Sequence, residues 1–312
     1  MKVKNLFRFL GILILLYLLI KIDLNSLLKT IKNINMIYFL IGILLSVPML
    51  FIKTMRFDYL TTSLHKKYKE NLFIMYFFTL ALGIFTPGKI GELSRVYYLK
   101  KNGASGRKSF FIVFADRIFD VITFSFFGVL SMLLFTHYFI KEIIFLFFMI
   151  AIGVLALALI YIFRKSLFKL VLNKFDRELS YNEFKEKLYE AWRKVQLSGV
   201  SYILFLSILS YIIFNIEVLL FAKALSIPLT FIQVIILVSI SSIINLIPIN
   251  ISGIGTRDAT FFYLFSIFEL GKELAISLSL IILFFWMIIY LAGIICGFVS
   301  KRESINVKDH QQ

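Results

Sequence analysis

Long apolar runs dominate the chain and alternate with short basic segments. Six of the runs are long enough to cross the roughly 30 Å hydrocarbon core of a bilayer as α-helices. They cover residues 6–20, 35–52, 109–135, 143–163, 200–222 and 274–299. The pattern therefore predicts an all-α, polytopic membrane helix bundle.

Two other apolar segments, 72–100 and 231–268, are interrupted by glycine and proline near their middle. The first carries TPGKIGELSR over residues 86–95, and the second carries PINISGIGTRD over residues 248–258. Transmembrane helices tolerate such residues as kinks, but discontinuous segments also enter the membrane and return on the same side as re-entrant hairpins. Periodicity alone leaves both alternatives open.

The distribution of lysine and arginine favours the hairpins. If both segments return, one side of the membrane carries 24 Lys and Arg residues and the other side carries six. The richer side holds both termini and the loops 53–71, 100–108 and 164–198, and the last of these has the pattern of an amphipathic helix. Because cytoplasmic loops are enriched in basic residues, we expect six full spans and two re-entrant helical hairpins, with both termini cytoplasmic at the plasma membrane.

Under this assignment the two hairpins enter from opposite sides, which indicates an inverted repeat. The repeats and their hairpins are 35–135 with 72–100 and 199–299 with 231–268, within a single domain covering 1–312. The segments 87–91 (PGKIG) and 251–255 (ISGIG) also align with Ile and Gly identical. Inverted repeats with discontinuous helices are typical of transporters, whereas two unrelated kinked helices are the simpler alternative.

Apart from Arg8 and Lys100 near their ends, nine Asp, Glu, Lys and Arg residues fall within the expected spans and hairpins. They are Lys89, Glu92, Arg95, Asp116, Arg117, Asp120, Glu217, Arg257 and Asp258. Each costs about 2.5–3.5 kcal/mol at the centre of a membrane helix, so we expect them to pair, to line water or to contact a charged ligand. Glu217 lies near the outer end of its span, where we expect an interfacial position.

The turns of the hairpins predict an anion-binding site at membrane depth. Glycine-rich turns expose backbone N–H groups, and the helices that follow favour negative charge at their N-termini. The residues that we expect to bind a lipid head group or its phosphate are Lys89, Arg95, Arg257, Gly88, Gly91, Gly253 and Gly255. The charge partners that we expect around them are Glu92, Asp116, Arg117, Asp120 and Asp258.

A structural alternative explains the same charges. In that alternative Arg95 pairs with Asp116 or Asp120. Arg257 pairs with Glu217, and both pairs simply lock the hairpins into the bundle. The two interpretations are compatible with each other.

Composition excludes several other classes of protein. The chain is 60% hydrophobic and 17% aromatic, with a mean hydropathy of +0.90, which lies beyond the usual range of soluble proteins. The net charge of +16 resides in short loops between apolar spans, so we expect no nucleic-acid partner. With Cys296 as the single cysteine, and His65, His137 and His310 scattered, we expect no metal, no cofactor and no catalytic residue.

Three motifs occur together: PGKIGELSR at 87–95, DRIFD at 116–120 and GIGTRD at 253–258. In this order and spacing they resemble the lysylphosphatidylglycerol synthase transmembrane-region family, also called the flippase-like domain. Ile251 and Ser252 stand where the family usually has Pro-Gly. Asp116 and Asp258 replace glutamates, so the carboxylates are kept in kind. The resemblance covers essentially the whole chain.

The resemblance implies the movement of a lipid between leaflets. In multiple peptide resistance factor, aminoacyl transfer belongs to a soluble domain that follows the membrane part. This chain ends thirteen residues after its last expected span, so we expect that domain to be absent. The resemblance leaves two lipid classes open: a charged phospholipid such as lysylphosphatidylglycerol, and a polyprenyl-phosphate-linked lipid.

The leading hypothesis is therefore a lipid flippase or scramblase rather than an enzyme. One rival is a membrane-embedded lipid-modifying transferase, of the phosphatidylglycerol lysyltransferase type or acting on a polyprenyl-phosphate sugar donor. The other is a scaffold for membrane enzymes of envelope lipid or glycan synthesis. Besides the lipid itself, such enzymes and a second copy of this chain are the candidate partners.

Overall fold

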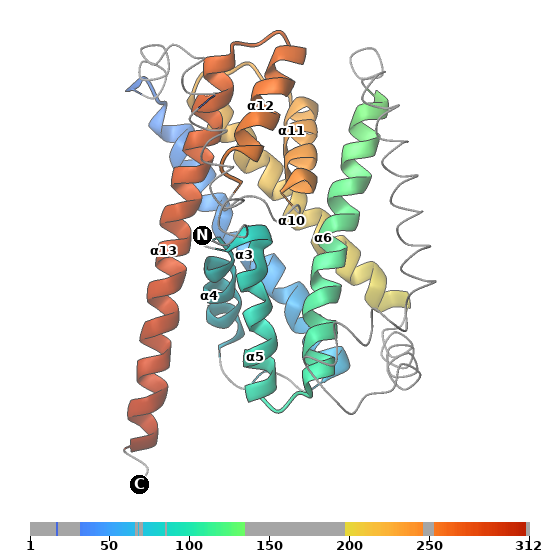
Figure 1. Cartoon of the computed structure of the whole chain (residues 1–312), viewed down its shortest axis with the longest axis vertical. Helices are drawn as coiled ribbons and strands as arrows, with labels where there is room; N and C mark the ends of the chain where they lie inside the picture. The colour runs from blue at the N-terminus through green and yellow to red at the C-terminus, as the bar shows by residue number, and fades with distance from the viewer. Residues whose placement is uncertain are drawn as a thin grey trace, which may run out of the picture.

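The computed structural model describes residues 32–65, 71–84, 86–134, 197–245 and 253–309, together with Tyr17 and Tyr68. Within these residues every regular element is helical (Figure 1). The elements are α3 (Met36–Leu64), α4 (Leu72–Ile84), η1 (Pro87–Leu93, a 3-10 helix), α5 (Ser94–Lys101), α6 (Gly106–Leu134), α10 (Leu197–Ala224), α11 (Phe231–Ile244), α12 (Thr256–Ile267) and α13 (Lys272–Asp309). The predicted all-α class is confirmed for this part of the chain.

Three helices are long and apolar enough to cross a membrane: Met36–Leu64, Gly199–Ala224 and Lys272–Val299. They correspond to three of the six predicted spans. The helix α6 covers a fourth and has the same length as α3, 29 residues, but charged residues interrupt its apolar sequence. The predicted spans 6–20 and 143–163 lie outside the described residues except for Tyr17. The predicted loop 164–198 also lies outside them, except for its last two residues, which begin α10.

The helix α3 is longer than predicted. Its predicted span ends at residue 52, followed by a loop over 53–71, but the helix continues to Leu64. Lys53, Arg56 and Asp58 lower the hydropathy of this stretch, although Phe57 and Leu60 keep a helical spacing and are buried. The prediction that residues 53–64 form a loop is therefore wrong, because helical packing continues beyond the last purely apolar stretch.

The two interrupted segments lie in opposite halves of the molecule in Figure 1: α4, η1 and α5 in the lower half, and α11 and α12 in the upper half. In the first, Thr86 is extended, Pro87 begins η1 and Lys89 has a positive φ of 57°. A Cβ atom at Gly91 would collide with the backbone of Leu82, so η1 packs directly on α4 only because this residue is glycine. The break between α4 and α5 thus depends on the small size of Gly91 and on the turn at Pro87 and Lys89.

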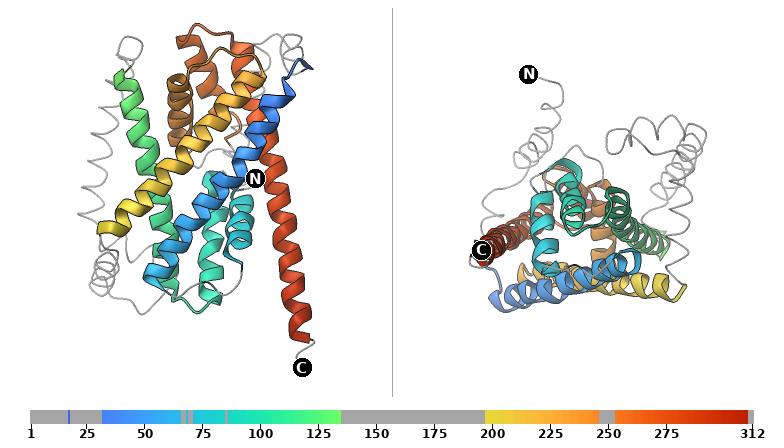
Figure 2. Two further views of the ribbon diagram at one scale, coloured as in Figure 1. Left: turned by 180° about the vertical axis from the view of Figure 1, so that it is seen from behind. Right: turned by 90° about the horizontal axis from the view of Figure 1, so that it is seen from below.

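The helices of the two halves pack across each other. The helices α3 and α10 run side by side along most of their lengths (Figure 2), while α4 packs on α13 and α11 packs on α6. Gly293 and Gly297 of α13 make close contacts with Phe77 and Phe78 of α4. Each interrupted segment therefore packs on the last long helix of the other half, the first on α13 and the second on α6.

Candidate functional site

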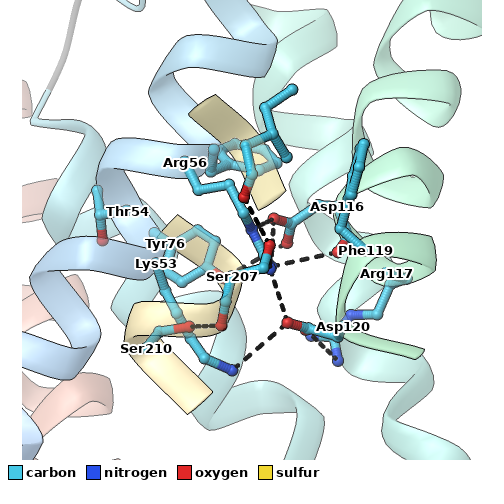
Figure 3. A network of polar contacts seen from close by, with 12 residues as sticks. Lys53, Thr54, Arg56, Tyr76, Asp116, Arg117, Phe119, Asp120, Ser207 and Ser210 are labelled. Atoms are coloured by element: carbon cyan, nitrogen blue, oxygen red, sulfur yellow. Dashed lines mark hydrogen bonds and ion pairs between the residues drawn. The ribbon is translucent and has the colours of Figure 1, made fainter. Parts of the chain in front are cut away.

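A network of buried charges occupies the region between α3, α5, α6 and α10 (Figure 3), and Arg56 lies at its centre. Its Nε donates to Asp116 Oδ1 at 2.9 Å, and its Nη1 donates to Asp120 Oδ1 at 2.8 Å and to Ser207 Oγ at 2.9 Å. Its Nη2 donates to the backbone carbonyl of Asp116 at 3.2 Å. One guanidinium therefore joins three long helices through charge-assisted hydrogen bonds.

Arg95 of α5 is also fully buried and shares Asp116 with Arg56. Its Nη1 donates to Asp116 Oδ2 at 2.9 Å, its Nη2 to Glu92 Oε2 at 3.0 Å and its Nε to Thr79 Oγ1 at 3.0 Å. The guanidinium also lies 3.9 Å from the centroid of the Tyr76 ring. The predicted pairing of Arg95 with Asp116 is thus observed, and each guanidinium nitrogen already has a protein acceptor.

Three other cations line the edge of this network and are partly exposed. Arg117 forms an ion pair with Glu92, and its side chain remains 28% exposed. Lys53 Nζ lies 3.8 Å from Asp120 Oδ1, with its side chain 20% exposed. Lys89 of η1 is exposed and lies in electrostatic range of both of these cations. These side chains can reach a ligand without breaking the buried pairs.

The network carries more positive than negative charge. Its cations are Lys53, Arg56, Lys89, Arg95 and Arg117, and its carboxylates are Glu92, Asp116 and Asp120. Five cations against three carboxylates leave a formal charge of +2 among the described residues. Since Arg56 and Arg95 are engaged with buried carboxylates, the excess lies on the partly exposed edge. Such an edge is suited to an anionic group.

The second interrupted segment is organised differently. Arg257 of α12 donates from Nε to Ser279 Oγ at 2.7 Å and from Nη2 to the Ser279 carbonyl at 3.0 Å, and it lies 3.8 Å from Asp258. Asp258 accepts hydrogen bonds from the Gly255 N–H at 2.7 Å and from Ser279 Oγ. Arg257 thus fastens α12 to α13, and Lys89 lies in electrostatic range of it.

Two of the backbone N–H groups that the sequence suggests for anion binding already have partners. The Gly91 N–H donates to Thr86 Oγ1 at 2.7 Å, and the Gly255 N–H donates to Asp258. Gly253 has a positive φ of 78° at the second break. Gly88 is the second residue of η1. The side chains at the edge of the network therefore offer more to a ligand in this conformation than the turns do.

One expectation about Glu217 is wrong. Among the described residues it makes no ion pair with Arg257, which bonds to Ser279 instead. Its residue surface is 0% exposed within α10, so neighbouring helices cover it. Its interfacial depth in the membrane stays a prediction.

Sequence reasoning missed Lys53, Arg56, Ser207 and Ser279. Lys53 and Arg56 are three residues apart, so they lie on one face of a helix, and this spacing was the available signal. The two serines carried no signal, because isolated serines are common in membrane helices. Among the described residues, no group of three His, Cys, Asp or Glu side chains is arranged to hold a metal ion.

Long apolar helices with ionisable residues buried between them define an α-helical integral membrane protein. The chain belongs to the family described as the lysylphosphatidylglycerol synthase TM region, which it matches over residues 6–293. This match confirms the resemblance seen in the three motifs and is consistent with a lipid-related membrane protein. No curated protein and no solved structure matches the chain significantly.

Proposed function

We propose that this protein moves a lipid with a phosphate-bearing head group between the leaflets of the membrane, as a flippase or scramblase. The observation that carries the proposal is the excess of positive charge on the partly exposed edge of an otherwise paired, buried network. A phosphate would neutralise that edge, while the acyl chains remain in the surrounding lipid. Membership of the family supports a lipid as the ligand.

The residues that we propose to hold the phosphate are Lys53, Lys89 and Arg117. Arg257 of the second half lies in electrostatic range of Lys89. The guanidinium nitrogens of Arg95 already donate to protein acceptors. Arg95 therefore positions Glu92 and Asp116 and does not hold the phosphate. Asp120 contacts Lys53 and Arg56 and sets their positions.

The packing of the helices supports an inverted repeat. Each helix of the first half has a counterpart in the second: α3 and α10, α4 and α11, α5 and α12, α6 and α13. If every helix is replaced by its counterpart, most of the pairs of packed helices are reproduced. For example, α4 packs on α13 as α11 packs on α6. Likewise α5 packs on α6 as α12 packs on α13. A two-fold relation between halves gives a transporter two equivalent states, each open to one side.

The remaining details are part of the same proposal. We propose six full spans and two re-entrant hairpins with cytoplasmic termini in the plasma membrane, because the basic residues are concentrated on one side. The lipid is a charged phospholipid resembling lysylphosphatidylglycerol or a polyprenyl-phosphate-linked lipid. These share a phosphate, which is the group that the three cations recognise.

Reconstitution in liposomes tests the proposal. Fluorescent phosphatidylglycerol, lysylphosphatidylglycerol, a polyprenyl phosphate and a lipid without phosphate are placed in both leaflets, and the inner pool that becomes accessible to a membrane-impermeant quencher is measured. We expect movement of at least one phosphate-bearing lipid above that in protein-free vesicles. Movement of none of them would contradict the function.

A triple variant tests the site. Changing Lys53, Lys89 and Arg117 to Gln should slow movement of the phosphate-bearing lipid about tenfold, which corresponds to a loss of about 1.4 kcal/mol. The matched control changes three exposed lysines near the α5–α6 connection, Lys100, Lys101 and Lys108, to Gln. Equal rates in the two triple variants would show that the edge of the network is not the head-group site.

A further inference from the structure

We propose that Glu217 is a proton-binding site, protonated in this conformation, and that it releases its proton when α10 and α13 separate. The site is distinct from the edge of the charged network. The consequence that lipid movement depends on pH rests on the proposed function, whereas proton binding by Glu217 does not.

The surroundings of Glu217 are aromatic. On α10, Phe214 precedes it by three residues and Phe221 follows it by four, so both lie on its face of the helix. Their rings contact Trp286 and Phe285 of α13, with centroid distances of 6.1 and 5.0 Å. The carboxyl group therefore lies in a contact between helices that is filled by aromatic rings.

Within the described residues, the Glu217 carboxyl has no charge partner and accepts no hydrogen bond of normal geometry. Both of its oxygen atoms are buried without a hydrogen bond, and so is Nε1 of Trp286. The indole lies beside the carboxyl but not in hydrogen-bond geometry. A charged carboxylate in such surroundings costs several kcal/mol, and a bound proton removes the charge.

Charged groups on the neighbouring helices do not supply a counter-ion. Three cations on α3 and α6 already have carboxylate partners. Lys53 pairs with Asp120, Arg56 with Asp116 and Asp120, and Arg117 with Glu92. The helix α11 contains no ionisable residue. From α13, Tyr290 lies in electrostatic range of Glu217 on one side and of Arg117 and Arg95 on the other.

This position gives the proton a route to affect the site. The helix α10 packs mainly on α3 and much less on α13, so the contact between α10 and α13 beside Glu217 is small. Separation of the two helices would hydrate the carboxyl and let it ionise. The new negative charge would act through Tyr290 on Arg117, one of the cations that we propose to hold the lipid.

Two measurements on the purified protein test proton binding without transport. Infrared difference spectra between acidic and alkaline buffer should show the carbonyl band of a protonated carboxylic acid, which disappears in Glu217→Gln and remains in the exposed control Glu269→Gln. In wild-type protein, a hydrophobic carbodiimide should modify Glu217, because it reacts with protonated carboxyl groups in apolar surroundings, and mass spectrometry of the peptides locates the product. Wild-type protein with no such band and no labelling at Glu217 would overturn the proposal.

The link to lipid movement is tested in liposomes at a series of pH values. Wild-type protein and Glu269→Gln should show a several-fold change in rate with pH, and Glu217→Gln should lose it, because its side chain cannot ionise. An unchanged pH dependence in a folded Glu217→Gln variant would overturn the link. Wild-type protein that binds the proton but moves no lipid would contradict the proposed function while leaving the proton site supported.

Discussion

The two halves of the molecule handle buried charge in different ways. In the first half, Arg56 and Arg95 share Asp116 and connect several helices through a network of ion pairs. In the second half, Asp258 caps the start of α12 and shares Ser279 with Arg257, while Glu217 has no partner among the described residues. The first half thus holds its buried charges in ion pairs, and the second contains the carboxyl that we propose to bind a proton.

The largest expected effect comes from removing the central cation of the first half. Arg56→Ala leaves Asp116 and Asp120 with too little positive charge in a buried site, which should cost about 3–5 kcal/mol of unfolding free energy. Thermal unfolding in detergent, followed by fluorescence and size-exclusion chromatography, measures the loss. The exposed Lys100→Ala in α5 is the control, and equal stabilities of the two variants would show that the network does not hold the helices together.

The two breaks should differ in their tolerance of a methyl group. Gly91→Ala forces a Cβ atom into the backbone of Leu82, and we expect a cost of about 1–3 kcal/mol from overpacking. In the second half, Gly253→Ala meets the side chain of Asn245 at 3.1 Å, where the neighbour can move, although the positive φ of 78° still strains the backbone. Unfolding midpoints of the two variants should therefore fall further for Gly91→Ala. The reverse order would contradict the tighter packing of the first break.

Ser279 tests how firmly the second half is fastened. Ser279→Ala removes one hydrogen bond from Arg257 and one to Asp258, and we expect a loss of about 1.5–3 kcal/mol, as for hydrogen bonds to charged groups. Ser277→Ala is the matched control, because that hydroxyl donates to the Glu273 carbonyl of its own helix. Denaturation of both variants in one detergent gives the difference, and a difference near zero would mean that Arg257 finds another partner.

The smallest effect should come from Glu217. If the carboxyl is uncharged, Glu217→Gln preserves its size and polarity, so stability at neutral pH should change by less than about 1 kcal/mol. Asp116→Asn in the first half removes a charge that two guanidinium groups share and should cost several-fold more. A comparable loss in both variants would indicate that Glu217 is charged and would remove the contrast between the halves.

The sequence predicted the helical class, four of the long helices and the family, because long apolar runs and short motifs are local properties. It placed Arg56 in a loop, because hydropathy falls wherever charges occur, even when a partner helix neutralises them. The pairing of Arg95 with Asp116 was one of two alternatives for that residue. The partner of Arg257 was predicted wrongly, since the face that a helix turns toward its neighbours depends on packing across the whole bundle.

Arg56 also has a consequence for motion. Its guanidinium bonds at once to α6 and to Ser207 of α10, so any movement that pulls α3, α6 and α10 apart would break several bonds to charged groups in apolar surroundings. The helix α13 meets α10 through aromatic rings instead. Arg95 adds α5 to the unit around Arg56 through Asp116. Separating α10 from α13 would therefore break fewer bonds to charged groups than any separation of the helices that meet at Arg56.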